Sequence, residues 1–382
     1  MHAIEHRLSQ QIRDLAGRTP GPFYIYDQAT LVRQCQAFLD IPYPDKAIHF
    51  ASMANSNPEF LRLVRAQGLR IFVNSPGHLA LARELGFEGH DIVYTASAMD
   101  DDLLRQVCAA GAILNLDSLG QLQRFRALFP GERAGLRCNI GDLVDPRQTR
   151  AGFFLGRESR LGLSLPEIES LAGSTDIAGL HLYIGTDLVE LDYFESCYEE
   201  LVRLARLFPN LSYMDFGGGF GLPREQGDGF PIADYGRYVS ALMTRLSTEL
   251  GRSIRLILEP GRIVGGEAGL FVCRVTDVKQ RNGTQLVGVN GSSAQFPRPL
   301  FYPDDARHPV SVLKAVGQVN GDPRQNSRIY GCSTYSRDFL ARDIELPALQ
   351  VGDLVVFGHA GSYCSSAYTH FLGFPPPQEF FV

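Results

Sequence analysis

Glycine-rich and charged segments follow two apolar runs in the second half of this chain. One run contains Asp215, ends at Phe216 and is followed directly by Gly217, Gly218 and Gly219. Consecutive glycines let backbone N–H groups approach a phosphate without obstruction by Cβ, although a tight turn is the structural alternative. A later run closes on Glu259, which begins a Glu-Pro-Gly-Arg segment. These two strand ends are therefore the first candidates for a site that binds a phosphate-bearing ligand.

Apolar β-rich runs alternate with amphipathic helical patterns between about residues 30 and 265. Eight strands alternating with helices are typical of a (β/α)8 TIM barrel, an α/β fold whose functional residues gather at the C-terminal strand ends. A doubly wound open sheet is the alternative, and it is disfavoured because no Gly-x-Gly-x-x-Gly follows the first strand. The barrel strands are expected at 47–51, 70–73, 91–95, 113–116, 135–138, 179–184, 213–216 and 255–258. The clearest helices between them are expected at 58–67, 78–85, 98–110 and 187–207.

The pattern changes after about residue 266, where short β-rich runs are separated by Gly, Pro, Asn and Asp. This change predicts a C-terminal β-sandwich or β-barrel domain, which the early strand 22–27 would join. Residues 28–265 would form the barrel, and 1–27 with 266–382 the β domain. The first seven residues are expected to begin an amphipathic helix. Strands of the β domain are expected at 269–279, 285–290, 311–319, 327–331, 354–358 and 378–382.

Composition limits the classes of partner and compartment. The net charge of −6 and the absence of a basic run argue against a nucleic-acid surface. No apolar stretch approaches the roughly 20 residues needed to span a membrane. The seven cysteines are scattered and lack CxxC spacing, which favours reduced thiols in a cytoplasm and no metal site.

The segment Phe50-Ala-Ser-Met53-Ala-Asn-Ser-Asn-Pro58 carries a family resemblance. It resembles the Tyr-Ala-x-Lys-Ala-Asn-x-Asn segment of the fold-type III decarboxylases, which depend on pyridoxal 5'-phosphate (PLP) and include diaminopimelate and ornithine decarboxylases. Further motifs in the family order extend the resemblance from about residue 22 to the C-terminus. It implies an alanine-racemase-like barrel, PLP as the cofactor, an amino acid as the substrate, and a homodimer with shared active sites.

The resemblance assigns cofactor-binding roles to matched positions. Glu259 would pair with the protonated ring nitrogen, which keeps the ring able to accept electrons. In His181-Leu-Tyr-Ile-Gly-Thr, Tyr183 would replace a stacking imidazole and Thr186 would donate its hydroxyl to the phosphate. The structural alternatives are a salt bridge for Glu259 and a core position for Tyr183. The other cofactor-binding positions implied are Gly217, Gly218, Gly219, Gly261, Arg262 and Tyr363.

Two segments of the β domain resemble substrate-binding elements of the same family. Arg298 and Tyr302 match an Arg-Pro-x-x-Tyr element that binds a substrate carboxylate, a task suited to the planar guanidinium fork. A surface arginine is the alternative. Gly331–Asp338 matches a segment with a catalytic cysteine and a substrate-binding acid, which places Thr334 at the cysteine and Asp338 among the catalytic positions. A register shift of two would place Cys332 there instead.

The largest departure is Met53, which stands where the family has its Schiff-base lysine. A thioether cannot form an imine, so PLP is expected to bind non-covalently or as an imine with the substrate. Lys46 cannot substitute, because seven residues of strand at about 3.3 Å each place it over 20 Å away. An engineered replacement of a natural lysine would explain this departure, but it would leave the changes at Tyr183 and Thr334 unexplained.

Three functions fit this combination. The first, which we favour, is a PLP-dependent amino-acid decarboxylase (a carboxy-lyase of amino-acid biosynthesis) that acts on a small carboxylated substrate through a lysine-free site. The second is a non-catalytic homologue that binds PLP or a partner. The third is racemase-type carbanion chemistry on the same scaffold. The sequence does not distinguish the candidate amino acids.

Overall fold

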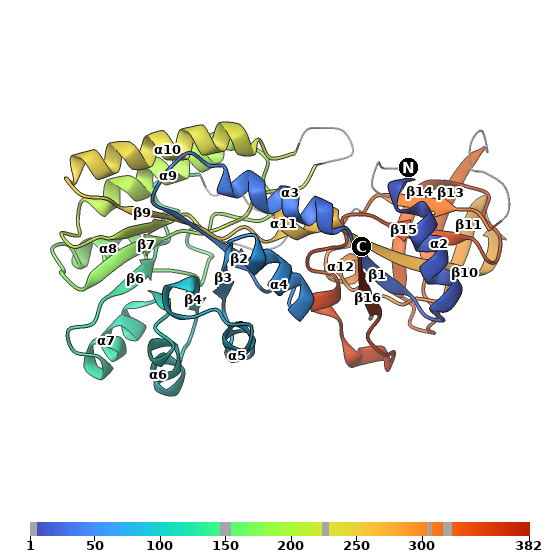
Figure 1. The fold of residues 1–382 in the computed structure, drawn as a ribbon, viewed down its shortest axis with the longest axis horizontal. Coiled ribbons are helices and arrows are strands. Elements are labelled where there is room, and N and C mark those ends of the chain that lie inside the picture. The colour runs from blue at the N-terminus through green and yellow to red at the C-terminus, as the bar shows by residue number, and fades with distance from the viewer. Residues whose placement is uncertain (1–5, 146–153, 224–228, 304–305, 307, 316–322) are drawn as a thin grey trace. The chain divides into compact units, whose positions relative to one another are not determined.

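A computed structural model describes the chain except for residues 1–5, 146–153, 224–228, 304–305, 307 and 316–322 (Figure 1). The chain divides into two compact units, residues 32–264 and residues 1–31 with 265–382. The expected division placed residues 28–31 and 265 in the barrel. Residues 28–31 belong to helix α3 (Gln28–Leu39), which therefore crosses the boundary. None of the described helices is long and apolar enough to cross a membrane.

Residues 32–264 form the predicted barrel. Eight parallel strands close on themselves in the order β2-β3-β4-β5-β6-β7-β8-β9, so the α/β barrel is confirmed and the open sheet is excluded. Closure is made by β2 and β9, where Ala47 lies opposite Ile257. The strands are β2 (Lys46–Ala51), β3 (Arg70–Val73), β4 (Ile92–Ala96), β5 (Ile113–Leu116), β6 (Ala134–Arg137), β7 (Ile177–His181), β8 (Tyr213–Asp215) and β9 (Arg255–Leu258).

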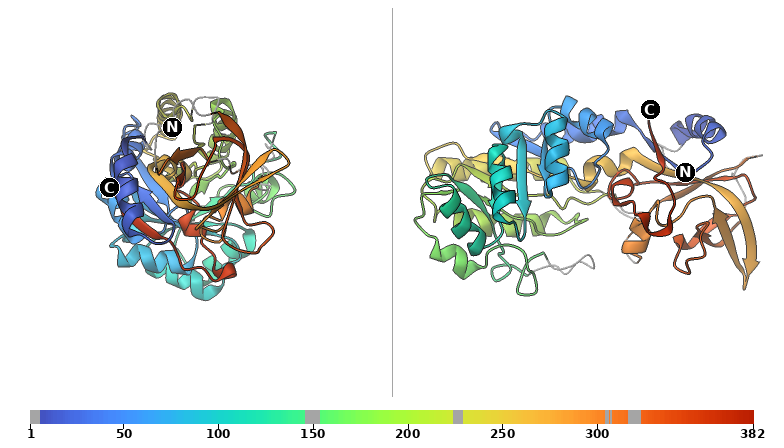
Figure 2. Two further views of the ribbon diagram at one scale, coloured as in Figure 1. Left: turned by 90° about the vertical axis from the view of Figure 1, so that its right-hand side faces the viewer. Right: turned by 90° about the horizontal axis from the view of Figure 1, so that it is seen from below.

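Helices lie outside the strands (Figures 1 and 2). Four of them begin at a polar capping side chain that accepts a hydrogen bond from the first turn, namely Asn57, Ser75, Asp100 and Ser118. These caps explain why each helix starts soon after a strand ends. The helices and short turns of this unit are α4 (Pro58–Ala66), α5 (Pro76–Glu84), η1 (Gly89–Asp91), α6 (Asp101–Ala109), α7 (Leu119–Leu128), α8 (Leu165–Ser170), α9 (Leu191–Ala205), α10 (Ile232–Glu249) and α11 (Arg262–Gly265).

The barrel interior is filled by small and aromatic side chains. Tyr213 lies across it, and a Cβ on Gly135 would fall 2.0 Å from the tyrosine oxygen. A Cβ on Gly179 would fall 2.2 Å from the same ring. Glycine at both positions therefore makes room for Tyr213, whose hydroxyl donates to Asn115 at 2.7 Å.

The second unit is mostly β-structure. The early strand β1 joins it as predicted, antiparallel to β10 and parallel to β16. Helix α2 (Ser9–Arg18) supplies Ile12 and Leu15 to the core of this unit. Of the N-terminal helix expected at 1–7, residues 1–5 lie outside the described residues. The strand end expected at 316–319 lies wholly outside them. The strands are β1 (Phe23–Tyr26), β10 (Gly269–Arg281), β11 (Thr284–Val289), β12 (Val310–Leu313), β13 (Arg324–Tyr330), β14 (Phe339–Pro347), β15 (Leu354–Phe357) and β16 (Gln378–Phe381). The short helical segments are η2 (Gly266–Ala268), α12 (Arg298–Phe301), η3 (Ser365–Ala367) and η4 (His370–Leu372).

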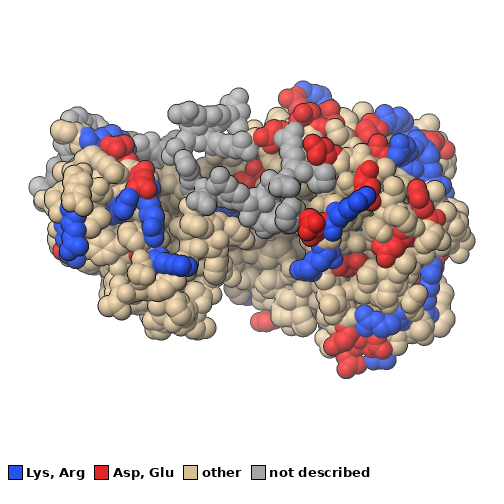
Figure 3. Space-filling view, turned by 180° about the vertical axis from the view of Figure 1, so that it is seen from behind, with Lys and Arg blue, Asp and Glu red and all other residues tan. Residues whose placement is uncertain are grey.

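Charges on the barrel unit are mixed in sign. On the face shown in Figure 3, acidic and basic side chains are interspersed over this unit, which lies on the right. Exposed ion pairs of this unit include Arg206 with Glu249 and Arg245 with Glu199. The described part of that face therefore presents a mixed surface rather than a field of one sign.

Candidate active site

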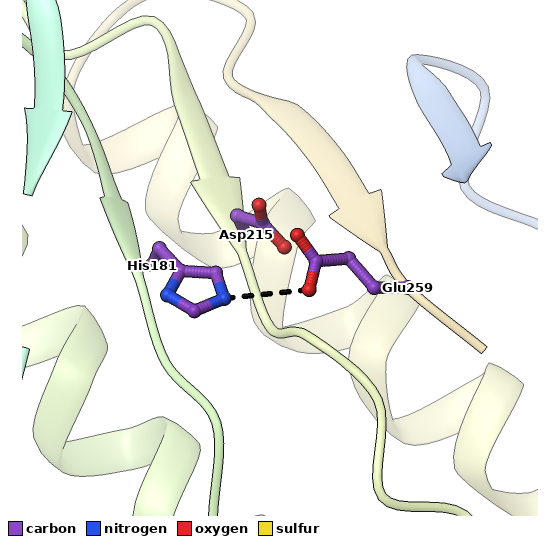
Figure 4. Close-up of side chains that lie close together, drawn as sticks. All are labelled: His181, Asp215 and Glu259. Carbon is purple, nitrogen blue, oxygen red and sulfur yellow. Dashed lines mark hydrogen bonds and ion pairs between the residues drawn. The ribbon is translucent and has the colours of Figure 1, made fainter. Parts of the chain in front are cut away.

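A buried histidine and two buried carboxylates meet at the C-terminal ends of neighbouring strands (Figure 4). His181 ends β7, Asp215 ends β8, and Glu259 directly follows β9. One ligand atom from each of the three lies within 4.8 Å of the others. Nε2 of His181 is 3.4 Å from Oε2 of Glu259. None of the three side chains is more than a few per cent exposed, so their charges are strongly coupled.

Burial decides the protonation of this cluster. Desolvation raises the pKa of Glu259 to about 8, partly opposed by a hydrogen bond with Asp215. Burial also raises the pKa of Asp215 well above its usual value, helped by the charge of Glu259. The pKa of His181 falls to about 4, again because burial disfavours the charged form. The two acids therefore retain a proton between them near neutral pH beside an uncharged imidazole.

Further polar groups fix the acid pair from the barrel interior. Asn115 donates to Asp215 at 3.1 Å, and the backbone N–H of Gly217 donates to the other Asp215 oxygen at 3.0 Å. In the sequence, Asp215 stands out only as the start of the glycine motif, and Asn115 belongs to no motif. The position of Asp215 at the end of an expected strand could have identified it as a site residue, because a carboxylate there lies on the functional rim of a barrel.

A largely buried ion pair lies on the same rim. Nη1 of Arg137, at the end of β6, is 3.6 Å from Oδ1 of Asp117, which follows β5. Asp117 also accepts hydrogen bonds from the hydroxyl of Ser97 at 2.6 Å and from the N–H of Gly162 at 3.0 Å. Burial lowers the pKa of Arg137, while Asp117 and then Glu259 oppose the shift. The sequence argument missed this pair, because its members are isolated polar residues 20 positions apart.

The glycine run occupies a crowded turn. Gly217 and Gly219 have φ of 61° and 99°, which other residues rarely adopt. A Cβ on Gly217, Gly218 or Gly219 would lie 2.4–2.5 Å from a backbone carbonyl oxygen of a neighbouring loop. The glycines are therefore required by the packing of the loops after β7, β8 and β9, in addition to any role towards a phosphate.

Arg262 presents a buried, partly unused guanidinium beside this turn. It is 8% exposed, and Nε donates to Oδ1 of Asp187 at 2.9 Å. Its Nη1 is buried and has no hydrogen-bond partner among the described residues. An unpaired buried cationic donor is costly, so an anionic group placed here would be stabilised. Gly261 is buried next to it, and Thr186 is half-buried on the neighbouring loop.

Met53 lies two residues beyond the end of β2, on the same rim. Its half-buried side chain packs against the apolar barrel interior, which includes Ala51, Phe72 and Tyr213. Lys46 is the first residue of β2 and therefore lies at the opposite end of the strand, with Nζ 3.3 Å from the carbonyl of Tyr43. The described part of the barrel unit thus places a thioether, and no amine, at this strand end.

Tyr183 makes an edge-to-face contact with another aromatic residue. Its ring centroid is 5.1 Å from that of Phe154, at an interplanar angle of 73°. Phe154 comes from the loop after β6, and the sequence argument did not identify it. Together the two rings form an aromatic surface that carries no ionisable nitrogen.

The remaining expected residues lie in the β unit. Arg298 is 8% exposed, and its guanidinium carbon lies 5.4 Å from the centre of the Tyr302 ring. Tyr363 is half-buried and has a positive φ of 56°. Thr334 and Cys332 are both exposed, so exposure does not separate the two registers.

Asp338 is buried and held by donors of its own unit. It accepts hydrogen bonds from the N–H of Ser293 at 2.6 Å and from the hydroxyls of Ser292 and Ser333. A Cβ on Gly331 would lie 2.4 Å from an Asp338 oxygen. Asp338 therefore ties the Gly331–Asp338 segment to the preceding turn, and a direct contact with substrate stays a prediction.

The barrel unit matches a known protein family. Residues 28–266 match the family described as the pyridoxal-binding domain of pyridoxal-dependent decarboxylases. Diaminopimelate decarboxylase from Streptomyces coelicolor is 30% identical, over 94% of this chain and 84% of its own length. The enzyme of the same name from Methanothermobacter thermautotrophicus is 27% identical over 97% of this chain and 88% of its own. The chain belongs to the pyridoxal-dependent decarboxylase family.

Solved structures agree with this fold. A diaminopimelate decarboxylase crystal structure matches with a TM-score of 0.88 and 24% identity, over 98% of this chain and 91% of that one. The Helicobacter pylori enzyme complexed with L-lysine matches with a TM-score of 0.85 and 21% identity, over 97% and 93%. A lysine/ornithine decarboxylase from Vibrio vulnificus complexed with putrescine gives 0.81 and 22%, over 100% and 99%. The α/β barrel followed by a mostly β domain is therefore the architecture of these decarboxylases.

Proposed function

We propose that this protein is a decarboxylase of a small carboxylated amino acid, similar to diaminopimelate decarboxylase, and that it binds PLP without a covalent lysine anchor. The observation that carries the proposal is the buried Asp215–Glu259 acid pair near the partly unused guanidinium of Arg262. The two groups match the two polar ends of PLP, its ring nitrogen and its phosphate. Similarity to diaminopimelate decarboxylases over nearly the whole chain supports the reaction class.

The residues of the barrel rim fit this cofactor. Glu259 and Asp215 would hold a proton at their oxygens and present it to a ring nitrogen. Arg262, the turn Gly217–Gly219 and the hydroxyl of Thr186 would bind the phosphate. PLP supplies the electron sink that makes loss of CO2 from an amino acid possible.

Met53 affects both the retention of PLP and the rate of turnover in such an enzyme. The thioether of Met53 can pack against a ligand, but it cannot bind one covalently. Retention of PLP would then depend on its phosphate, its ring contacts and the bound amino acid. We therefore expect slow turnover, because a lysine normally speeds exchange of the substrate amine.

Arg298 is the proposed ligand of the substrate carboxylate. Its guanidinium is largely buried beside Tyr302, which favours a fixed orientation for bidentate pairing. Thr334, at the family's cysteine position, is a far weaker acid than a thiol, so return of a proton to the product would need another donor. Tyr363 is proposed as a further phosphate ligand, Asp338 as a support of the Thr334 segment, and the assembly as a cytoplasmic homodimer.

Binding and catalysis can be tested together. Purified protein would be titrated with PLP, with and without diaminopimelate, lysine or ornithine, while the visible spectrum and CO2 release are recorded. We expect an amino-acid-dependent absorption band and slow CO2 release, both abolished in Glu259→Gln. The matched control Glu249→Gln changes an exposed glutamate on α10 and should behave as wild type.

A second candidate is a non-catalytic homologue, favoured by Met53 and its apolar surroundings. It predicts that PLP or a PLP–amino acid adduct binds while no CO2 is released. Absence of any spectral change with all three amino acids would contradict the decarboxylase proposal.

A further inference from the structure

Three loops that carry the proposed phosphate ligands are joined by backbone hydrogen bonds. They follow β7, β8 and β9 and contain Thr186, Gly217–Gly219 and Arg262 respectively. Leu188 N–H donates to the carbonyl of Gly219 at 2.9 Å, and Gly221 N–H donates to the carbonyl of Leu188 at 2.8 Å. The loops after β7 and β8 are therefore paired like two short strands.

Asp187 directly precedes Leu188, and its side chain connects this pairing to the third loop. Its Oδ1 accepts from the N–H of Leu222 at 3.1 Å and from Nε of Arg262 at 2.9 Å. One carboxylate oxygen thus connects the loops after β7, β8 and β9. The arginine it holds is the one whose Nη1 has no partner among the described residues.

The backbone at Asp187 is also specialised. Its φ is 59°, in the left-handed region that aspartate and asparagine tolerate better than most residues. A Cβ on Gly221 would lie 2.8 Å from the carbonyl carbon of Asp187, so the two backbones are in direct contact. This conformation turns the carboxylate towards Leu222 and Arg262, which is the geometry expected of a support for the guanidinium.

We propose that Asp187 is a positioning residue, which orients the Arg262 guanidinium and closes the three loops into one phosphate-binding cradle. The inference rests on the proposed function, because the phosphate is that of PLP. The guanidinium would bridge two anionic groups: Nε donates to Asp187, and Nη1 is left to donate to a phosphate oxygen.

The alternative is that Asp187 weakens phosphate binding. A carboxylate beside Arg262 could compete with phosphate for the positive charge, in which case removal of Asp187 would strengthen phosphate binding. The direction of the change therefore decides between support and competition.

The experiment compares PLP with pyridoxal, which lacks the phosphate, by equilibrium dialysis. The ratio of the two dissociation constants isolates the contribution of the phosphate. Asp187→Asn keeps an acceptor oxygen, and Asp187→Gly removes it while suiting the positive φ. The matched controls are Asp45→Asn and Asp45→Gly, since Asp45 binds Nε of Arg255 at the same 2.9 Å at the opposite end of β9.

We expect Asp187→Gly to weaken PLP binding by about 10-fold or more, as for loss of a charged hydrogen bond, with pyridoxal binding little changed. Asp187→Asn should stay within about 3-fold of wild type, because the acceptor is retained. Both Asp45 variants should keep the wild-type ratio.

Two results would overturn the inference: a ratio that is unchanged in Asp187→Gly, whether neither or both compounds bind more weakly, or tighter PLP binding. If wild type binds PLP no better than pyridoxal, the phosphate cradle itself is wrong. If wild type binds neither compound, the proposed function fails along with this role of Asp187. Thermal unfolding of each variant checks that the comparison is made on folded protein.

Discussion

The ends of β7, β8 and β9 and the end of β2 lie on the same rim of the barrel, but they differ in character. The first region holds His181, Asp215 and Glu259 in a buried, hydrogen-bonded cluster. At the second, Met53 packs on apolar side chains of the barrel interior. Buried charge of this kind is costly and persists where partners or a ligand compensate it. Under the proposed function, the groups that bind the two ends of PLP are present, while the position that would bind it covalently is apolar.

Restoring an amine at residue 53 should give the largest effect. Met53→Lys places an ammonium group on the rim, and its apolar surroundings should lower the lysine pKa enough to make it nucleophilic. We expect the variant to bind PLP covalently, so that borohydride reduction adds the mass of one phosphopyridoxyl group to the intact protein.

The matched control is Met53→Leu, which keeps the apolar contacts and adds no amine. It should show no increase in mass. If Met53→Lys also remains unmodified while still binding PLP, residue 53 does not face the cofactor, and the contrast between the two regions is wrong.

Loss of Arg137, which like Arg262 is a largely buried cation on the rim, should destabilise the fold. Arg137→Ala leaves Asp117 largely buried without its counter-charge, which costs roughly 3–5 kcal/mol for a buried pair. Denaturant unfolding measures the change. The double variant Arg137→Ala/Asp117→Asn should recover part of the loss, and a double variant no more stable than Arg137→Ala would show that packing, rather than charge, is responsible.

The acid pair predicts a pH dependence of smaller size. The pKa of Glu259 is raised from 4.5 to about 8 on folding, so the folded chain holds the extra proton between these values. Unfolding free energy should therefore fall as pH rises, by at most about 1.4 kcal/mol per pH unit. The lowered pKa of His181, about 4 instead of 6.5, acts in the opposite direction below pH 6.5. Burial also lowers the pKa values of His49 and His78, and these two act in the same direction as His181. Unfolded histidines still bind protons above pH 6.5, so the difference between wild type and Glu259→Gln is what isolates the acid.

Denaturant unfolding of ligand-free protein across pH 6.5 to 8 checks this expectation. Glu259→Gln should flatten the profile, apart from what Asp215 contributes in the same direction. A wild-type profile that falls no more steeply with pH than that of Glu259→Gln would contradict a protonated Glu259.

The smallest effect on activity is expected at the β-unit segment. Asp338→Asn replaces a carboxylate that accepts from three serines with a neutral amide, which should cost about 1–3 kcal/mol of stability. If Asp338 only supports the Gly331–Asp338 segment, KM for the amino acid should change little once the variant is saturated with PLP. A large rise in KM with unchanged stability would instead make Asp338 a direct substrate ligand.

Much of the barrel was predictable because its strands are continuous apolar runs between turn signals. The expected bounds of β3, β5 and β9 match the structure. β7 ends at His181, whereas the expected strand ran on to Ile184. The apolar pattern continues past the strand because Leu182 and Ile184 are buried outside the sheet. β14 was missed: its centre carries Arg342 and Asp343, and the positive φ of Asp343 breaks the alternation expected of a strand.

The residues of the site were predictable only where they sit in motifs. Glu259 and Gly217–Gly219 stand out by local pattern and lie together on the rim. The Arg137–Asp117 pair and the Asp187–Arg262 contact join residues 20 and 75 positions apart. Such pairs depend on how strand ends are brought together, and no local spacing of residue types reveals them.

The most direct test of the lysine-free site is the intact mass of wild-type protein after incubation with PLP and borohydride reduction. Absorbance before reduction gives the amount of PLP bound. The account predicts bound PLP and an unmodified protein mass. A mass increase mapped to Lys46, Lys279 or Lys314 would contradict it, and so would a protein that binds no PLP.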